Sequence, residues 1–364
     1  MNDIVSDIVK IKEAIPGFLE HQCNKEENGY YSYSYTGDIY GSNVHWNVPG
    51  SVFAADIAYV IKDVGNPKIG MALKYLKSFQ KNNGYIYSDL IRKKGFCSHL
   101  LGQMKSRKIT DISNADYVRA ETRQVLRTLN AYNSLPDNIP QNEIIKGKEV
   151  LGYLHSLNWN KPWAAGSHFS HKLFFLKIAY INGIISEDSY KAETRKFVDF
   201  IDEMWKPIGA WGANSGVTLQ QFINGAMKIL TGLELLDWYH LPEDKAEQLT
   251  DLCLKSLNDT QACDNYNIIY ILKCTKKILG DYREKEINAY AERKFRKYLE
   301  FYYPQYGGFS FLPGHANNNY YGFHISKGKN EPDIHGTRMF VWGIDLIAQI
   351  LGIEDEVGLQ QMKE

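Results

Sequence analysis

The chain has 364 residues, of which 44% are hydrophobic and 23% are charged, as in a soluble globular protein. Its 42 basic and 42 acidic residues give a formal net charge of zero, which argues against a nucleic-acid or membrane-surface partner. No apolar run approaches the roughly 18–20 residues that would cross a bilayer, and the N-terminus lacks the pattern of a signal peptide. The 5 cysteines form no CxxC pair, so we expect reduced thiols and a cytoplasmic protein.

Apolar residues recur with helical period along the chain, and strand-like alternation is scarce. In chain order the pattern predicts helices at 3–22, 47–63, 67–81, 112–134, 140–157, 164–183, 186–206, 217–237, 242–257, 263–280, 283–302 and 334–351. Starting with the first, every second helix is amphipathic, whereas those between are apolar nearly all round. We therefore predict an all-α protein with six outer helices around six inner ones. No Pro- or Ser-rich linker divides the chain, so residues 1–364 should form a single (α/α)6 toroid domain.

The turns between these helices share a pattern in which an aromatic residue closely follows a glycine. Examples are NGYYSYS (28–34), QKNNGYI (80–86), GAWG (209–212) and YGGFSF (306–311). From residue 158 onward the turns recur about every 50 residues, which accommodates two helices and two connections. The pattern resembles the repeat of the squalene-cyclase (terpenoid cyclase) and protein prenyltransferase superfamily, although Ile86 replaces the tryptophan of its nearest match. The resemblance implies the (α/α)6 toroid fold.

Polar and aromatic residues collect where each inner helix begins. In a toroid the inner helices run parallel, so their N-termini converge on one mouth, where helix dipoles favour an anion. Capping explains some of these residues, but not the His, Trp and Glu found further into the helices. The catalytic candidates are Glu121, Asp264, His168, His171, His335 and Asp333. The substrate-binding candidates are His45, Trp46, Tyr117, Arg119, Arg123, Gln124, Trp163, Trp211, Asn224, Asn265, Tyr266 and Thr337.

Two groups of candidates have competing interpretations. Glu121 shares a helical face with Tyr117 and Gln124, flanked by arginines, and is either a general acid or base or a structural ion-pair partner. His168 and His171 share a face at i, i+3 spacing. We expect them to line the cavity as hydrogen-bond donors or a general base, the alternative being core histidines bonded to their neighbours.

The last inner helix opens with Asp333-x-His335-Gly336-Thr337, which resembles the zinc-binding histidine region of prenyltransferase β-subunits. Gly307, Gly308, Pro313 and Gly314 match the loop that precedes it in that family. The partner helix, ACDNYNIIYIL (262–272), has Cys263 and Asn265 where the family has aspartate and cysteine, and asparagine is a poor zinc ligand. We therefore predict that no cofactor is required. If a divalent metal binds, its candidate ligands are Cys263, Asp264 and His335.

The chain also lacks the DDxxD and DxDD motifs that terpenoid cyclases use. The predicted cavity combines carboxylates and histidines with Trp and Tyr, which is more typical of a sugar pocket than of a polyprene pocket. We therefore expect a cytoplasmic enzyme that acts on an anionic carbohydrate or glycoconjugate by hydrolase, lyase or epimerase chemistry. The alternatives are an isoprenoid enzyme with a non-standard acid and a non-catalytic ligand-binding toroid. The expected partner is a small-molecule, sugar or diphosphate-bearing substrate.

Overall fold

The structure is a computed structural model that describes residues 2–24, 29–39, 48–93, 114–213, 216–321 and 323–362, with only the backbone given for 92–93. The described part is mostly helical, which confirms the prediction of a mainly α-helical protein.

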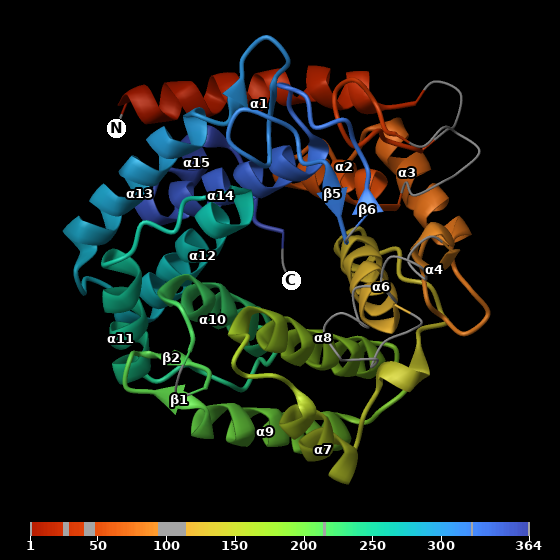
Figure 1. Cartoon of the computed structure of the whole chain (residues 1–364), viewed down its shortest axis with the longest axis vertical. Coiled ribbons are helices and arrows are strands. Elements are labelled where there is room, and N and C mark those ends of the chain that lie inside the picture. Colours follow the sequence, from red (N-terminus) through yellow and green to blue (C-terminus); the bar gives the residue numbers. More distant parts are fainter. Residues whose placement is uncertain are drawn as a thin grey trace.

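In Figure 1 the helices form a ring, and helices on its outside alternate along the chain with helices on its inside. The outer helices are α1 (Asn2–Gln22), α3 (Pro67–Ser78), α7 (Lys148–Ser156), α9 (Glu187–Glu203), α11 (Glu243–Leu254) and α13 (Glu284–Leu299). The inner helices are α2 (Val48–Val60), α6 (Ala115–Ala131), α8 (Pro162–Ile181), α10 (Leu219–Leu233), α12 (Ala262–Leu279) and α14 (Ile334–Leu351). Shorter helical segments in the connections are α4 (Leu90–Lys93), η1 (Gln141–Glu143) and α15 (Glu354–Val357).

Most observed helices agree with the predicted ranges to within a few residues at each end. The exception is the predicted helix at 140–157, which is a short 3-10 turn, η1, followed by α7. Gly147 lies between them with a φ of 63°, a left-handed conformation that ends a helix and that glycine adopts readily. The predicted helices at 47–63 and 112–134 begin outside the described residues.

The inner helices are buried on nearly every side because they pack between the outer helices and one another. In α14 every residue from Ile334 to Ile350 is buried except His335 and Gln349. The outer helix α11, in contrast, buries only one stripe of its surface. Despite their apolar character, none of the described helices is both long and apolar enough to span a bilayer.

Neighbouring inner helices run parallel. A Cβ on Gly166 of α8 would lie 2.8 Å from the Gly225 carbonyl oxygen of α10, and one on Gly232 would lie 3.0 Å from the Cα of Ser170. Early residues of one helix thus meet early residues of the next, and later residues meet later ones. Contacts between α14 and α2, and between α10 and α12, follow the same order. These helices therefore begin on the same face of the ring.

The glycine-aromatic segments form tight antiparallel turns after outer helices. β1 (Trp205–Lys206) pairs with β2 (Ala210–Trp211) after α9, and β3 (Tyr302–Tyr303) pairs with β4 (Gly308–Phe309) after α13. Isolated bridges join residues 23 and 31 after α1 and residues 80 and 86 after α3. The sequence pattern thus corresponds to a repeated structural element. A further hairpin of β5 (Asn319–Tyr320) and β6 (Phe323–His324) lies in the loop before α14.

The C-terminal segment after α14 joins the two ends of the chain. Lys12 of α1 donates hydrogen bonds to the carbonyl oxygens of Val357 at 3.2 Å and Gly358 at 2.7 Å. The backbone N–H of Gln360 then donates to the carbonyl of Val60 at the end of α2, at 2.9 Å. These contacts place the last described residues across the C-terminal ends of inner helices.

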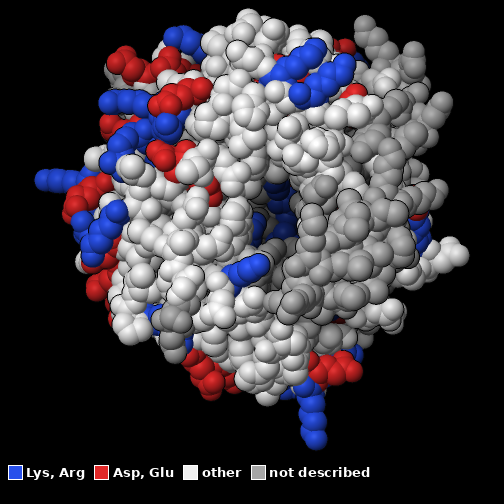
Figure 2. Space-filling model, in the orientation of Figure 1, with Lys and Arg blue, Asp and Glu red and all other residues white. Residues whose placement is uncertain are grey.

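The ring has a hollow at its centre. Figure 2 shows that the face turned toward the viewer is hollowed, with Lys and Arg side chains inside the hollow. Acidic and basic side chains also lie along the outer edge of the ring in this view. Positive charge is therefore not confined to the outside of the molecule.

Candidate functional site

Partly exposed polar side chains lie along the first halves and the middle turns of several inner helices. We call this group the mouth. It consists of Tyr117, Arg123, Gln124, Ser167, His168, Lys228 and His335, together with the less exposed His171 and with Tyr321 from the loop before α14. The charge of Lys228 lowers the pKa of both His171 and His335, which belong to different helices. Lys228 on α10 therefore lies close enough to join the α8 and α14 sides of the mouth into one electrostatic site.

Two predicted site residues, Arg119 and His168, come together with Asp116 on the α6 and α8 side. Arg119 donates a hydrogen bond to Asp116 at 2.6 Å and also contacts Nδ1 of His168. Because a guanidinium can only donate, Nδ1 of His168 is the acceptor, and in the neutral ring the proton is on Nε2. The Asp116 carboxylate lies 3.7 Å from the same Nδ1.

His171 lies one helical turn further into α8, where it is 8% exposed. Burial, and then the charges of Arg123, Arg119, His168 and Lys228, hold its pKa well below the usual value. Its Nε2 is 3.3 Å from the hydroxyl of Ser167, and its Nδ1 has no hydrogen-bond partner among the described residues. His171 is therefore a neutral imidazole surrounded by cationic groups.

His335 is held in one orientation by aromatic and polar neighbours. Its ring stacks against Phe53 at a centroid distance of 4.7 Å and against Phe311 at 4.5 Å. Its Nδ1 is 3.1 Å from the hydroxyl of Tyr33, which also accepts a hydrogen bond from Asn317 at 3.1 Å. Because Nδ1 is engaged, Nε2 is the ring atom left for a ligand. With the proton on Nδ1, Nε2 can accept a proton; in the other tautomer it donates one.

Burial, together with the positive charges of Arg338 and Lys228, holds the pKa of His335 well below its usual value. The ring is therefore neutral near pH 7. An anion bound beside it would reverse the effect of the cations and raise this pKa. Proton affinity at His335 is thus coupled to the charge of whatever occupies the mouth.

A buried cluster of charges supports the wall of the ring below His335. Asp56 is fully buried, and it accepts hydrogen bonds from Arg127, from Nε of Arg338 at 2.6 Å and from Thr128 at 2.7 Å. The guanidinium of Arg338 also lies 3.7 Å from the ring centroid of Trp342. Two guanidinium groups therefore share one buried carboxylate here.

The predicted catalytic Asp333 caps α14. Its carboxylate accepts hydrogen bonds from the backbone N–H groups of Gly336 at 2.7 Å, Phe311 at 2.8 Å and Asn317 at 2.9 Å. Burial raises its pKa to about 7 despite these bonds. A Cβ on Gly336 would lie 2.3 Å from the backbone nitrogen of Phe311, so only glycine fits there. Asp333 and Gly336 thus position the loop that carries Phe311 against His335.

The predicted candidates on α12 point into a polar network between helices. Asp264 is fully buried and accepts hydrogen bonds from Asn224 at 2.7 Å and Gln220 at 2.8 Å, as well as from Thr260. Asn265 accepts a hydrogen bond at 3.1 Å from Lys294 on the outer helix α13. These contacts hold α10, α12 and α13 together, so we leave Asp264, Asn224 and Asn265 out of the proposed site.

Glu121 and Thr337 also bind backbone groups of neighbouring loops. The fully buried Glu121 accepts a hydrogen bond from the N–H of Ser88 at 2.9 Å. The Thr337 hydroxyl accepts one from the N–H of Phe309, also at 2.9 Å. Both residues therefore attach an inner helix to the glycine-aromatic turn that precedes it.

The predicted aromatic platforms occupy different environments. Trp211 is fully buried and packs edge-on against Trp205, so neither ring face is open to a sugar. Tyr266 is 4% exposed and lies beside Trp342, with ring centroids 5.8 Å apart. Trp163 is partly exposed at the start of α8. His45 and Trp46 lie outside the described residues.

The structure adds aromatic residues that the sequence did not single out. Tyr321 stacks on Tyr117 with ring centroids 4.9 Å apart. Gln124 donates a hydrogen bond to the Tyr321 hydroxyl and accepts one from Tyr320, both at 3.0 Å. Tyr33 fixes His335. The loops that carry these residues are rich in tyrosine, which is consistent with the lining of a cavity. That pattern does not indicate which of the tyrosines face the cavity.

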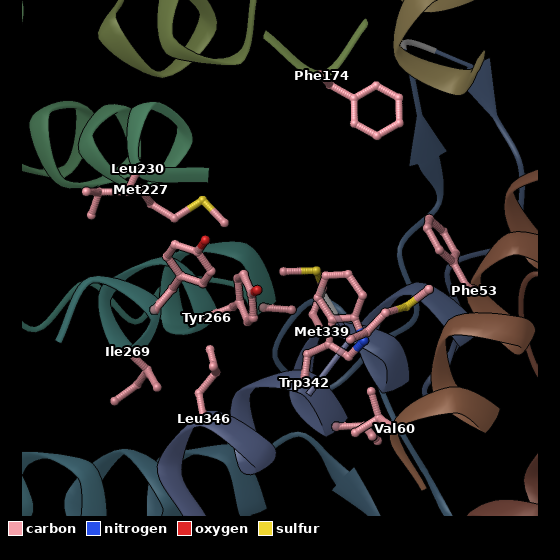
Figure 3. Close-up of a cluster of buried hydrophobic side chains, with 14 of the residues drawn as sticks. Phe53, Val60, Phe174, Met227, Leu230, Tyr266, Ile269, Met339, Trp342 and Leu346 are labelled. Carbon is pink, nitrogen blue, oxygen red and sulfur yellow. The ribbon is translucent and has the colours of Figure 1, made fainter. Parts of the chain in front are cut away.

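Below the mouth the interior is largely apolar. Figure 3 shows Phe53, Phe174, Met227 and Trp342 projecting from different inner helices toward a shared space, together with other apolar side chains. Each of these is no more than 6% exposed. The ring interior therefore combines a charged entrance with a hydrophobic and aromatic region below it.

Two of the three residues proposed as metal ligands, Asp264 and His335, are held by other partners. Burial raises the pKa of the Cys263 thiol to about 11, Asp264 is bound by its amide and hydroxyl neighbours, and His335 is fixed by Tyr33. Within the described ranges, no group of three or more His, Cys, Asp or Glu side chains is arranged to hold a metal ion.

Comparison of the chain with protein-family models, curated proteins and solved structures found no match. The function must therefore be argued from the site. Its cations can bind an anion, its neutral histidines can donate or accept protons, and its stacked tyrosines can contact a ring.

Proposed function

We propose that this chain is a cytoplasmic enzyme with an (α/α)6 toroid fold that acts on an anionic carbohydrate or glycoconjugate at the mouth. The fold proposal is supported by the alternation of outer and inner helices and by the parallel direction of neighbouring inner helices. The cytoplasmic location is supported by the cysteines of the described residues, which are free thiols.

The observation that carries the functional proposal is the convergence of cations on neutral histidines. Arg119, Arg123 and Lys228 act together on His171, and Lys228 also acts on His335. A carboxylate or similar anion would be held by these charges. The paired rings of Tyr117 and Tyr321 lie on the same side as Arg123 and would contact the sugar ring.

Among the possible reactions, we favour elimination or epimerisation over hydrolysis. Hydrolysis needs two carboxyl groups that flank the glycosidic bond, whereas Glu121, Asp264 and Asp333 bind backbone and amide groups. In elimination, a base removes the proton from the carbon next to the uronate carboxylate. The electron pair forms a C=C bond, the C–O bond at the adjacent carbon breaks, and the departing oxygen takes up a proton. His335 is our candidate for the proton transfer at Nε2, and Lys228 for neutralising the carboxylate.

The test is incubation of the full chain in D2O with uronate-containing oligosaccharides, followed by NMR and ultraviolet absorbance. Both elimination and epimerisation remove the proton next to the carboxylate. We therefore expect deuterium incorporation or a new conjugated double bond. His335→Ala should abolish this signal, whereas His155→Ala, at an exposed histidine of the outer helix α7, should not. If the oligosaccharide binds but neither deuterium exchange nor elimination is seen, the proposal of an enzyme is contradicted. A non-catalytic ligand-binding protein is then favoured.

A second candidate function is supported by the aromatic and methionine-rich interior in Figure 3. An isoprenoid diphosphate could place its charged group among the cations of the mouth and its chain along Phe174, Met227 and Trp342. Asp345 is the candidate acid, since it is 3% exposed and burial raises its pKa to about 6. Turnover of geranylgeranyl diphosphate that is lost in Asp345→Asn, without any reaction on uronates, would establish this function instead.

A further inference from the structure

A second cavity lies at the opposite ends of the inner helices. It has a volume of about 890 Å3 and is lined by the second halves of α8, α10 and α12, by the connection at 234–241, and by Asn130 of α6 and Gln361 of the C-terminal segment. Small-molecule sites typically measure about 300–1,000 Å3. We call this cavity the C-terminal groove. At its inner end the groove reaches Phe174 and Leu230, which follow His171 and Lys228 of the mouth by three and two residues. The groove therefore continues the apolar interior below the mouth, and Lys277 and Ile278 lie at its other end.

The walls of the groove are apolar and partly open to solvent. Ile181 is 48% exposed and Ile278 is 37% exposed, and both line it. The buried side chains of Leu233 and Leu236 continue the same surface inward. An exposed apolar surface that continues into a cavity is typical of a binding site for an apolar group.

The charged groups of the groove are unevenly paired. Lys177 binds Asp237 at 2.7 Å, and Glu234 accepts hydrogen bonds from Tyr270 and Cys274. Among the described residues, Lys273 in the second half of α12 donates only to the amide oxygen of Gln361, at 3.3 Å. Its charge lowers the pKa of the neighbouring Asp345. Lys277, one turn further on, is exposed and has no ion pair within the described part of the chain. Positive charge therefore lies beside the apolar wall at this end.

We propose that the C-terminal groove binds a molecule with an apolar chain and a single anionic head group, such as a long-chain carboxylate. The chain lies along Ile181, Leu233 and Ile278, and the head group lies near Lys277. This site is additional to the function proposed for the mouth and does not depend on it.

The test is titration calorimetry of the full chain with decanoate below its micelle concentration. Decanol has the same chain without the charge, and butyrate has the charge with a short chain. We expect saturable binding of decanoate, binding of decanol weaker by at least about tenfold and no detectable binding of butyrate. Absence of saturable decanoate binding would overturn the proposal. Equal affinity for decanol would overturn the role of the anionic head group.

Single substitutions test whether decanoate binds in the C-terminal groove. Ile181→Asp should abolish decanoate binding, and Lys277→Glu should weaken it at least about tenfold. Both side chains are exposed, so circular dichroism should show an unchanged fold. The matched controls are Leu257→Asp, at an exposed leucine outside the groove, and Lys255→Glu, at the end of α11; neither should change the affinity. Unchanged affinity in both groove variants would place the decanoate elsewhere and refute the assignment.

Discussion

Replacing the buried Asp56 by asparagine should destabilise the fold strongly. The Asp56 side chain is 0% exposed, and the side chains of Arg127 and Arg338 that share it are 2% and 9% exposed. Asp56→Asn keeps the size of the side chain but removes the carboxylate that the buried guanidiniums of Arg127 and Arg338 share. Removing one partner of a buried ion pair costs about 3–5 kcal/mol, and two arginines depend on this carboxylate. We therefore expect the free energy of unfolding to fall by at least about 3 kcal/mol.

Urea denaturation followed by circular dichroism measures this change. Asp199→Asn, at an exposed aspartate of α9, is the control and should stay within about 0.5 kcal/mol of the wild type. The double variant Asp56→Asn with Arg338→Met should lose less than the sum of the single variants, because it also removes one of the two cations that Asp56 binds. A loss below about 1 kcal/mol in Asp56→Asn would show that the cluster is hydrated, and would refute the reasoning from its burial.

Three further predictions concern the mouth and its support. Sulfate binding to the mouth should be accompanied by proton uptake, because the pKa values of His171 and His335 are low in the free protein and a bound anion raises them. The affinity for sulfate should therefore rise as the pH falls. Calorimetry in buffers of different ionisation enthalpy measures the proton uptake, and a value of zero would contradict the prediction. Gly336→Ala should lower the melting temperature, since the added Cβ would overlap the backbone of residues 310–311. Gly152→Ala, in open space on α7, should be neutral or stabilising by up to about 1 kcal/mol. Equal melting temperatures of the two variants would contradict this. Tyr33→Phe should change the tautomer of His335, measured by 15N NMR, with circular dichroism unchanged; an unaltered ring spectrum would show that Tyr33 does not select the tautomer.

Local patterns in the sequence predicted the helices well. Apolar periodicity placed a helix at 186–206, close to the observed Glu187–Glu203. The pattern failed at 140–157, because the left-handed Gly147 interrupts the chain and periodicity carries no information on backbone conformation. The inner helices were recognisable because burial on all sides demands apolar residues on all sides.

The site was harder to predict, because its contacts join distant parts of the chain. The spacing of His168 and His171 correctly placed them on one face, and the structure brings Arg119 to them. Asp333 begins a helix whether it serves as a cap or as a catalytic acid, so its position alone could not separate the two. The contact between Tyr33 and His335 spans 302 residues, and no local pattern encodes it.

The bonds from Lys12 to residues 357 and 358 have a consequence for biosynthesis. They join residues that are 345 and 346 positions apart, so they form only after residues 357 and 358 have left the ribosome. Until then the first helices of the growing chain lack their neighbours from the last repeat, and α2 exposes to water the apolar side that α14 later covers. Such distant contacts slow folding because loop closure must precede them. The nascent chain therefore passes through a stage in which chaperone binding and aggregation compete with closure of the ring.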